Sequence, residues 1–188
     1  IVKRITSLDT RAINNIVDIT NFCLIEAGQP LHAFDYDKLT GGKITVRRAK
    51  QGEKIVTIDE VERELDPSIL IIADEKKPVA IAGIMGGKET EVTSSTKNIL
   101  LESAYFDPIL VRKASRKLGL STDSSYRFER GGDLEMVEKC ADRTLSLILE
   151  IAKGRLIARS KIETKRKTIR PSISLSLDLL NSYLGTNI

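Results

Sequence analysis

Apolar side chains recur at the three- and four-residue spacing of a helix with one buried face in three parts of the chain. The first of these stretches starts after a cap at Asp9 or Thr10 and ends at Gly28, and Pro30 prevents its continuation. The second stretch ends at Gly119. We therefore predict three helices, which cover residues 11–27, 108–118 and 134–152.

Short runs rich in Ile and Val alternate with turn residues between the first two predicted helices, a pattern typical of strands. Asp66-Pro67, Lys77-Pro78 and Gly86-Gly87 mark turns between these runs. The segment at residues 28–35, which holds the sole histidine, is predicted to be a loop. Together with two later alternating runs, strands are predicted at residues 43–48, 54–58, 69–73, 79–84, 99–104, 126–130 and 156–162.

The order of these elements predicts an α+β fold, in which a β-rich central sheet or barrel-like sandwich is flanked by helices. Residues 161–170 are charged and loosely patterned, as in a linker. A strand at residues 173–177 and a helix at residues 179–184 would begin another module. We expect a first domain at residues 1–163, followed at residues 164–188 by a linker and the truncated start of that module.

The composition is typical of a globular domain and excludes several classes of protein. Hydrophobic residues make up 41% and charged residues 30% of the 188 residues, and no apolar run is long enough to cross a bilayer. Lys3 and Arg4 argue against a signal peptide, and two cysteines without an extracellular marker argue against a disulfide framework. We expect a cytoplasmic protein without membrane contact. Cys23, Cys140 and one histidine cannot form a four-ligand zinc site, so no metal is expected.

Charge and aromatic content bear on a nucleic-acid partner. The net charge of +4 fits a polyanionic partner but does not establish one. Aromatic residues make up only 4% of the chain and Trp is absent, so stacking on bases is not expected to be the main grip on RNA. One basic cluster on the second predicted helix is either a solvated face or a contact with phosphates: Arg112, Lys113, Arg116 and Lys117.

Two short motifs suggest nucleotide chemistry but fail on their context. Residues 82–88 come close to a phosphate-binding loop, but Glu89 rather than Ser or Thr follows Lys88 and no helix is predicted after it. A tight glycine turn is the simpler interpretation. Tyr126-Arg127-Phe128-Glu129 resembles the Arg-Glu signature of class II synthetase cores, but no later glycine-rich stretch ending in Arg follows. A strand with both aromatic residues on one face is predicted there instead.

Glu102 and His32 each allow two interpretations. Glu102 stands in an otherwise apolar or small run, so its carboxylate is either paired with Arg127 or Arg130 or faces a pocket. His32 is either a packed, hydrogen-bonded loop residue or part of a site. The sequence holds no Gly-x-Ser-x-Gly elbow, so catalysis by a serine nucleophile is not indicated.

Five runs of residues resemble the beta chain of bacterial phenylalanyl-tRNA synthetase and follow one another in that family's order. They include Gly-Gln-Pro-Leu-His-Ala-Phe-Asp and Gly-Leu-Ser-Thr-Asp-Ser-Ser-Tyr-Arg-Phe-Glu-Arg-Gly. Five multi-residue matches in one order are a more specific signal than any lone motif. The runs cover residues 13–21, 28–35, 82–87, 99–106 and 119–131.

This resemblance implies an editing domain that hydrolyses the ester of tRNA(Phe) mischarged with tyrosine. It also implies a whole enzyme of two alpha and two beta chains that uses ATP and magnesium, with no cofactor in this domain. Many relatives have Ala where this chain has Ser124, which adds a hydroxyl to the implied pocket. By the same match, the catalytic groups would be Thr20, Asn21, His32 and Gly86, and the substrate-binding groups Glu102, Thr122 and Ser124.

In the implied reaction, the Glu102 carboxylate would accept a hydrogen bond from the tyrosine phenol. An apolar synthetic pocket rejects an added hydroxyl only weakly, so a second site that binds the hydroxyl directly would remove the error. The ester is already activated, so a positioned water would suffice without a covalent nucleophile. The rival hypothesis is a noncatalytic RNA-binding or assembly module in which Glu102 forms a core ion pair. An ATP-using synthetase core is disfavoured by the missing glycine-rich stretch.

Overall fold

The structure is a computed structural model that describes residues 1–162 and 172–188. The described residues form two compact units, Ile1–Arg155 and Leu156–Ile188. The domain boundary expected after residue 163 lies outside the described residues, as does most of the predicted linker. None of the helices among the described residues is long and apolar enough to cross a membrane.

The second unit contains α6 (Leu177–Leu184), which begins after Ser176, whose hydroxyl accepts a hydrogen bond from the Leu179 backbone N–H. The strands predicted at residues 156–162 and 173–177 are wrong, because the structure has no strand in either range and α6 already begins at Leu177. Ile162 and Ile173 are 91% and 89% exposed in this unit. Without a buried face, alternation of apolar and polar residues does not hold a strand in register.

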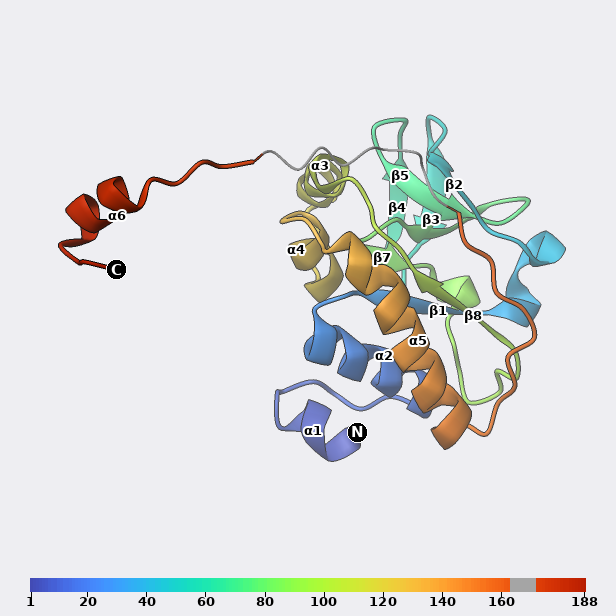
Figure 1. The fold of residues 1–188 in the computed structure, drawn as a ribbon. Helices are drawn as coiled ribbons and strands as arrows, with labels where there is room; N and C mark the ends of the chain where they lie inside the picture. Colours follow the sequence, from blue (N-terminus) through green and yellow to red (C-terminus); the bar gives the residue numbers. More distant parts are fainter. Residues whose placement is uncertain (163–171) are drawn as a thin grey trace. The chain divides into compact units, whose positions relative to one another are not determined.

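The first unit is an α+β arrangement of antiparallel sheets with flanking helices, which confirms the predicted fold class, and its sheets form no closed barrel among the described residues (Figure 1). The helices are α1 (Val2–Thr6), α2 (Asn15–Ala27), α3 (Pro108–Leu118), α4 (Asp123–Phe128) and α5 (Leu134–Ile151). The strands are β1 (Leu31–Asp35), β2 (Thr45–Arg48), β3 (Glu53–Val56), β4 (Glu62–Leu65), β5 (Leu70–Ala73), β6 (Pro78–Ile81), β7 (Met85–Gly86) and β8 (Ile99–Ser103). Short 3-10 helices lie at Tyr36–Lys38, Thr40–Gly42 and Lys88–Thr90.

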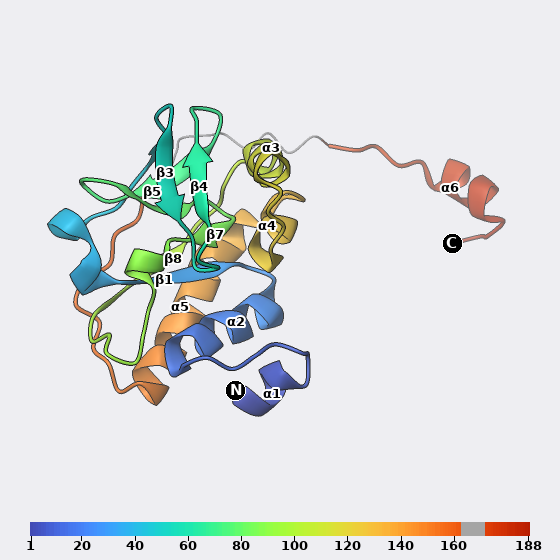
Figure 2. The ribbon, with the colours of Figure 1, turned by 180° about the vertical axis from the view of Figure 1, so that it is seen from behind.

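Three sheets organise this unit. β1 pairs with β8 and β3 pairs with β4 as two-stranded ribbons, and the third sheet has the strand order β2-β5-β6-β7. Figures 1 and 2 show α2 and α5 on one side of the β1–β8 ribbon and the four-stranded sheet on the other. The ribbon therefore stands between a helical layer and a β layer.

Each face of the β1–β8 ribbon contributes to a different hydrophobic core. Leu31, Ile99 and Leu101 pack with the core of α1, α2 and α5. Phe34, which is fully buried, and Leu100 pack with the core of the four-stranded sheet, α3 and α4. Since side chains alternate along a strand, every second residue of the ribbon is directed toward the four-stranded sheet.

The start of α2 differs from the prediction. The helix begins at Asn15 rather than near residue 11, because Asn14 is the cap and its side-chain oxygen accepts the Val17 N–H at 3.0 Å. The Asp18 carboxylate accepts the Ile13 N–H at 2.8 Å, so a side chain rather than the helix backbone satisfies this donor. The predicted caps, Asp9 and Thr10, lie outside the helix.

Two further segments differ in type from the prediction. The predicted loop at residues 28–35 contains β1, because β8 supplies a partner strand that local sequence does not show. The predicted strand at residues 126–130 is mostly α4, because Thr122 and Ser125 form a capping box that starts a helix three residues earlier. As a result, Phe128 is buried whereas Tyr126 is 55% exposed, so the two aromatic residues do not share a face.

The remaining boundaries follow the sequence more closely. α3 begins at Pro108 after Asp107, whose carboxylate accepts the Ile109 N–H at 2.9 Å, and both α3 and α5 confirm their predictions. The strand predicted at residues 79–84 ends early, at Ile81, and a turn leads into β7. At this turn Gly83 has φ +70°, and a Cβ there would stand 3.0 Å from the Phe106 ring. Only glycine fits this turn.

Candidate functional site

His32 and Glu102 stand opposite each other on the β1–β8 ribbon. The antiparallel register pairs His32 directly with Glu102, between the neighbouring pairs Leu31–Ser103 and Ala33–Leu101. Directly opposed residues project from the same face, with Cβ atoms roughly 5 Å apart. By alternation from Phe34 and Leu100, that face is the one directed toward the four-stranded sheet.

The His32 ring is enclosed by an aromatic ring and a glycine. Its centroid lies 4.4 Å from that of Phe34 in an edge-to-face arrangement. A Cβ placed on Gly86 would stand 2.4 Å from His32 Cε1 and 2.6 Å from Nε2, so the imidazole occupies the space that any other side chain would fill. His32 Nε2 is fully buried and has no hydrogen-bond partner among the described residues. Burial lowers the pKa of His32 from 6.5 to about 4, so the ring is neutral at pH 7.

Glu102 is a half-buried carboxyl group without an ion pair in the described part of the chain. Burial raises the pKa of Glu102 from 4.5 to about 7, because the charged form is poorly solvated there. The salt bridge considered from sequence is wrong, since Arg127 pairs with Asp123 at 2.9 Å and Arg130 with Glu129 at 2.7 Å. Neither arginine is therefore the partner of the Glu102 carboxyl group.

Thr122 is hydrogen-bonded to the backbone just before β7, the strand that contains Gly86. The Gly86 carbonyl accepts a hydrogen bond from the Ile58 N–H at 3.0 Å, which fixes β7 beside the β3–β4 ribbon. The Thr122 hydroxyl donates to the Ile84 carbonyl at 2.8 Å and also accepts the Ser125 N–H at 3.1 Å. The start of α4 is thereby held two residues from Gly86, and Ser124 lies half-buried in the first turn of that helix.

Thr20 and Asn21 come from α2, which packs on β1 from the helical layer. Thr20 is buried, and its hydroxyl donates to the Val17 carbonyl in its own helix at 2.8 Å. The structure thus brings His32, Gly86 and Glu102 together and fastens Thr122 nearby. No hydrogen bond among the described residues joins either α2 residue to this group.

Gln29 supports the ribbon and was not singled out from the sequence. It is 3% exposed, and its side-chain Nε2 donates to the Ala104 carbonyl at 2.8 Å and to the Pro30 carbonyl at 3.1 Å. This amide fastens the beginning of β1 to the end of β8, next to the His32–Glu102 pair. The available signal was a long polar side chain between a helix-ending glycine and a proline.

One cavity of the unit is separate from these residues. It has a volume of about 210 Å³ and lies between β3, β6 and the 3-10 helix after Gly87, with Lys54, Glu62, Lys77 and Glu89 among its lining residues. Its charged side chains pair with one another, Lys54 with Glu62 and Lys77 with Glu89. We place the candidate site at the ribbon because His32 Nε2 and the Glu102 carboxyl group, which stand opposite each other, have no hydrogen-bond partner among the described residues. Among the described residues, no cluster of His, Cys, Asp and Glu could hold a metal ion.

Comparison with known proteins defines the class first. Residues 1–153 match the family described as B3/4 domain, so the chain belongs to the B3/4 domain family. Within that family it is similar to proteins named phenylalanine–tRNA ligase beta subunit. That of Moorella thermoacetica is 55% identical over 179 residues, which are 95% of this chain and 22% of the relative.

Two further relatives carry the same name. The protein of Geobacter metallireducens is 48% identical over 188 residues, 100% of this chain and 24% of the relative. That of Aquifex aeolicus is 53% identical over 171 residues, 88% of this chain and 22% of the relative. These matches confirm the resemblance seen in the five sequence runs. The chain spans less than a quarter of the length of these curated relatives.

Proposed function

We propose that this B3/4 domain hydrolyses the ester of tRNA(Phe) mischarged with tyrosine and that Glu102 identifies the tyrosine by its phenolic hydroxyl. The observation that carries the proposal is the unpaired, half-buried Glu102 carboxyl group opposite a neutral His32. A half-buried acid without a partner costs folding free energy, and a ligand that pairs with it offsets this cost. The similarity to phenylalanine–tRNA ligase beta subunits supports an aminoacyl-tRNA as that ligand.

The raised pKa of Glu102 suits this recognition. With a pKa of about 7, both protonation states are populated near neutral pH. The carboxylate accepts a hydrogen bond from the phenol, and the neutral acid can donate one to the phenol oxygen. Phenylalanine offers neither group, so a bound phenylalanyl ring leaves Glu102 without a partner. A hydrogen bond to a charged group contributes about 1.5–3 kcal/mol, which is roughly 10- to 150-fold in discrimination.

The chemical step is the addition of water to the ester carbonyl. The water oxygen bonds to the carbonyl carbon, the bond from that carbon to the ribose oxygen breaks, and the released proton ends on the ribose hydroxyl. The products are tyrosine and tRNA with a free 3′ end. We assign His32, Gly86, Thr20 and Asn21 to holding the water and the ribose, and Thr122 and Ser124 to the wall of the amino-acid pocket. His32 acts as a positioning residue in this scheme, because burial keeps its ring neutral.

The wider setting follows from the relatives. We propose that the whole enzyme works in the cytoplasm, pairs two alpha with two beta chains, binds tRNA(Phe), and uses ATP and magnesium at a synthetic site outside this domain. The sequence printed here supplies the hydrolytic part of that cycle.

The test compares deacylation of tyrosyl-tRNA(Phe) and phenylalanyl-tRNA(Phe) by the 188-residue chain and its variants. The wild-type chain should hydrolyse the tyrosyl ester and spare the phenylalanyl ester. Glu102→Ala should slow tyrosyl release roughly 10- to 150-fold, because the phenol loses its partner. The rate of tyrosyl release by Glu102→Gln should lie between those of wild type and Glu102→Ala, since an amide still forms a hydrogen bond with the phenol. Glu62→Gln removes an exposed acid on β4 and is the matched control.

A second variant tests the role of His32. His32→Ala should reduce the rate less than tenfold if the ring only positions water and ribose, whereas complete loss would indicate proton transfer by the imidazole. The proposal is refuted if the wild-type chain hydrolyses neither ester above background. If Glu102→Ala still hydrolyses the tyrosyl ester in preference to the phenylalanyl ester, Glu102 does not recognise the phenol.

A further inference from the structure

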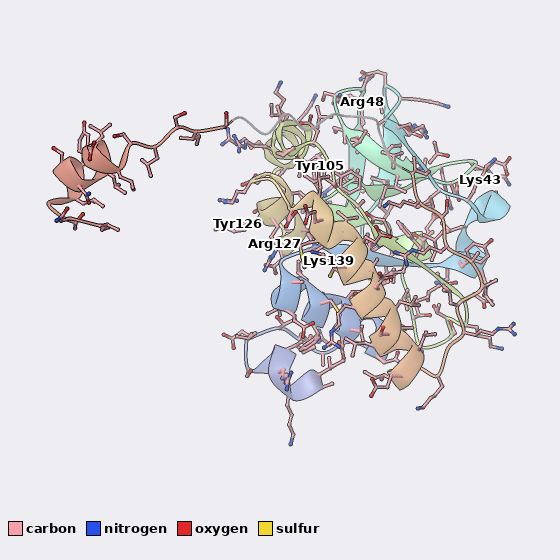
Figure 3. All side chains as sticks on the ribbon, in the orientation of Figure 1. Lys43, Arg48, Tyr105, Tyr126, Arg127 and Lys139 are labelled. Carbon is pink, nitrogen blue, oxygen red and sulfur yellow. The ribbon has the colours of Figure 1, made fainter. Side chains whose placement is uncertain are left out.

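Two exposed tyrosines and an arginine lie where β8 and α4 leave the candidate site. We call Tyr105, Tyr126 and Arg130 the aromatic rim. Tyr126 is 55% and Tyr105 38% exposed. Figure 3 shows both tyrosines on the side of the unit formed by α4 and the start of α5, and Lys43 and Arg48 elsewhere. Tyr36 and Tyr183 are the other tyrosines, so the rim contains two of the 4 tyrosines of the chain.

The rim is held in place by specific contacts. The Arg130 guanidinium lies over the Tyr126 ring, with its carbon 3.5 Å from the ring centroid. Arg130 Nη1 donates to the Tyr126 carbonyl at 2.8 Å and to Glu129 Oε1 at 2.7 Å. The Tyr105 ring lies beside the loop after Arg130, since a Cβ on Gly132 would stand 3.9 Å from Tyr105 Cδ2. The stacked pair is therefore ordered before any partner arrives.

Both tyrosines are connected to the site through short pieces of backbone. Tyr105 follows Glu102 by three residues along the chain. Tyr126 lies one helical turn beyond Thr122, and its N–H donates to the Thr122 carbonyl at 2.9 Å. Thr122 is in turn bonded to the Ile84 carbonyl beside β7. Each tyrosine therefore lies within four residues, along the backbone, of a residue of the candidate site.

The chemistry of the rim favours flat, unpaired bases. Every nucleobase has a π-face that stacks on an aromatic ring or on a guanidinium plane. The positive charge around the rim is largely balanced, because Arg130 pairs with Glu129 and Arg127 with Asp123. A strongly basic patch would bind any phosphate backbone, whereas this neutralised surface offers stacking and little net field.

We propose that the aromatic rim binds the unpaired bases at the 3′ end of an RNA while its terminal ribose ester lies at Glu102. This inference rests on the proposed function and identifies how the substrate is held. The composition led us to expect that stacking on bases would contribute little to RNA binding, and this proposal differs from that expectation. Two of the 4 tyrosines lie at this rim, and the overall percentage of aromatic residues does not show their position.

The experiment measures RNA binding and ester hydrolysis separately with the 188-residue chain. A fluorescein-labelled single-stranded RNA ending in 3′-CCA reports binding by anisotropy, and tyrosyl-tRNA(Phe) reports steady-state hydrolysis. Tyr126→Ala should weaken binding of the labelled RNA about tenfold and raise KM for the tyrosyl ester to a similar extent, with kcat unchanged. Tyr126→Phe should keep the wild-type RNA affinity and the wild-type KM, because it keeps the aromatic ring. Arg130→Ala and Tyr105→Ala should show the same pattern with smaller changes.

Matched controls are Tyr183→Ala, an 82% exposed tyrosine of the second unit, and Arg48→Ala, an exposed arginine of β2. Equal anisotropy and equal KM for Tyr126→Ala, Arg130→Ala and wild type would overturn the proposal. Rim variants that keep RNA binding but lose association with the alpha chain would overturn it in favour of a protein interface. RNA binding that depends on the rim, without any ester hydrolysis, would support the rim as an RNA-binding surface and refute the proposed function.

Selective hydrolysis of the tyrosyl ester that is unchanged in the rim variants would support the proposed function and refute the role of the rim.

Discussion

The first unit contains two antiparallel ribbons of two strands, which differ in whether their charged side chains form ion pairs. On the β3–β4 ribbon, charged side chains find charged partners, as in the pairs of Lys54 with Glu62 and Arg63 with Asp59. On the β1–β8 ribbon, Glu102 faces His32 across the strands, and neither polar group has a partner among the described residues. Under the proposed function, the paired charges of the β3–β4 ribbon stabilise the fold, whereas the Glu102 carboxyl group is the one that binds a ligand. Substitutions at or against one ribbon at a time should therefore alter either hydrolysis or stability.

The largest effect is expected from Gly86→Ala, which places a Cβ where the His32 ring now lies. The clash shifts the ring together with Glu102, which stands opposite it, or with the β7 backbone. Displacement of several groups of the site by about 1 Å can reduce a rate on the order of 100-fold, which exceeds the loss expected when the ring alone is removed in His32→Ala. Tyrosyl-tRNA deacylation measures this loss. Gly154→Ala is the control, since a Cβ there meets nothing within 4 Å. If Gly86→Ala retains the wild-type rate, close contact of the His32 ring with Gly86 is not needed for hydrolysis.

Glu53→Ala should affect stability and leave hydrolysis unchanged. Glu53 binds the Arg47 guanidinium through both carboxylate oxygens, at 2.6 and 2.9 Å, and also accepts the Lys50 N–H at 2.8 Å. Its removal leaves a partly buried Arg47 and a backbone donor without a partner, which costs about 2 kcal/mol. Urea unfolding measures the change. An equal loss of deacylation at full folding would show that the β3–β4 ribbon is part of the site.

The pH dependence of stability should distinguish Glu102 from His32. The pKa of Glu102 is raised to about 7, so its contribution to stability is full below its ordinary pKa of 4.5 and is lost as the pH rises through 7. The pKa of His32 is lowered to about 4, so its contribution is full above its ordinary pKa of 6.5 and is lost as the pH falls toward 4. The two slopes oppose each other in the wild-type protein.

Glu102→Gln removes one of these slopes. Relative to wild type, Glu102→Gln should be more stable at pH 8 than at pH 5: the difference in the free energy of unfolding, variant minus wild type, should be larger at pH 8 by on the order of 1 kcal/mol after allowance for partial exposure. Urea denaturation at both pH values gives the comparison, with Glu62→Gln as the control on the other ribbon. A constant difference between variant and wild type would mean that the carboxyl group of Glu102 is well solvated in the folded state.

The smallest effect is expected from the pair of Lys54 and Glu62. Both side chains are 58% exposed, and exposed pairs contribute little because water and salt screen them. Lys54→Ala, Glu62→Ala and the double variant should have urea midpoints within experimental error of wild type. A clear coupling in this double-mutant cycle would show that the ribbon holds its charges more rigidly than their exposure indicates.

The sequence predicted those elements whose signals are local. α3 and α5 carry helical spacing with recognisable first and last residues, and both form as predicted. β1 was missed because its stability comes from β8, which is distant along the chain. α4 was missed because the alternation at residues 126–130 outweighed the capping box that begins at Thr122. Helical spacing and caps were sufficient for α3 and α5, whereas the pairing of β1 with β8 is visible only in the fold.

The candidate site follows the same division. Glu102 and His32 could be singled out from sequence, as a single acid in an apolar run and as the sole histidine, and the resemblance added a site role for Gly86. Neither source predicted that His32 and Glu102 are paired across two strands or that the ring fills the space above Gly86. The role of Gln29 depends on the Ala104 carbonyl, which only the folded chain brings within reach.

The separation of β1 and β8 along the chain has a consequence for how the domain comes into being. The whole four-stranded sheet and the β3–β4 ribbon are synthesised between the two strands that hold His32 and Glu102. A nascent chain therefore lacks the carboxyl group until nearly all of the β layer has emerged, and contacts of this range form late in folding. Fragments cut anywhere between the two strands would each hold half of the pair, so function could return only by their reassociation.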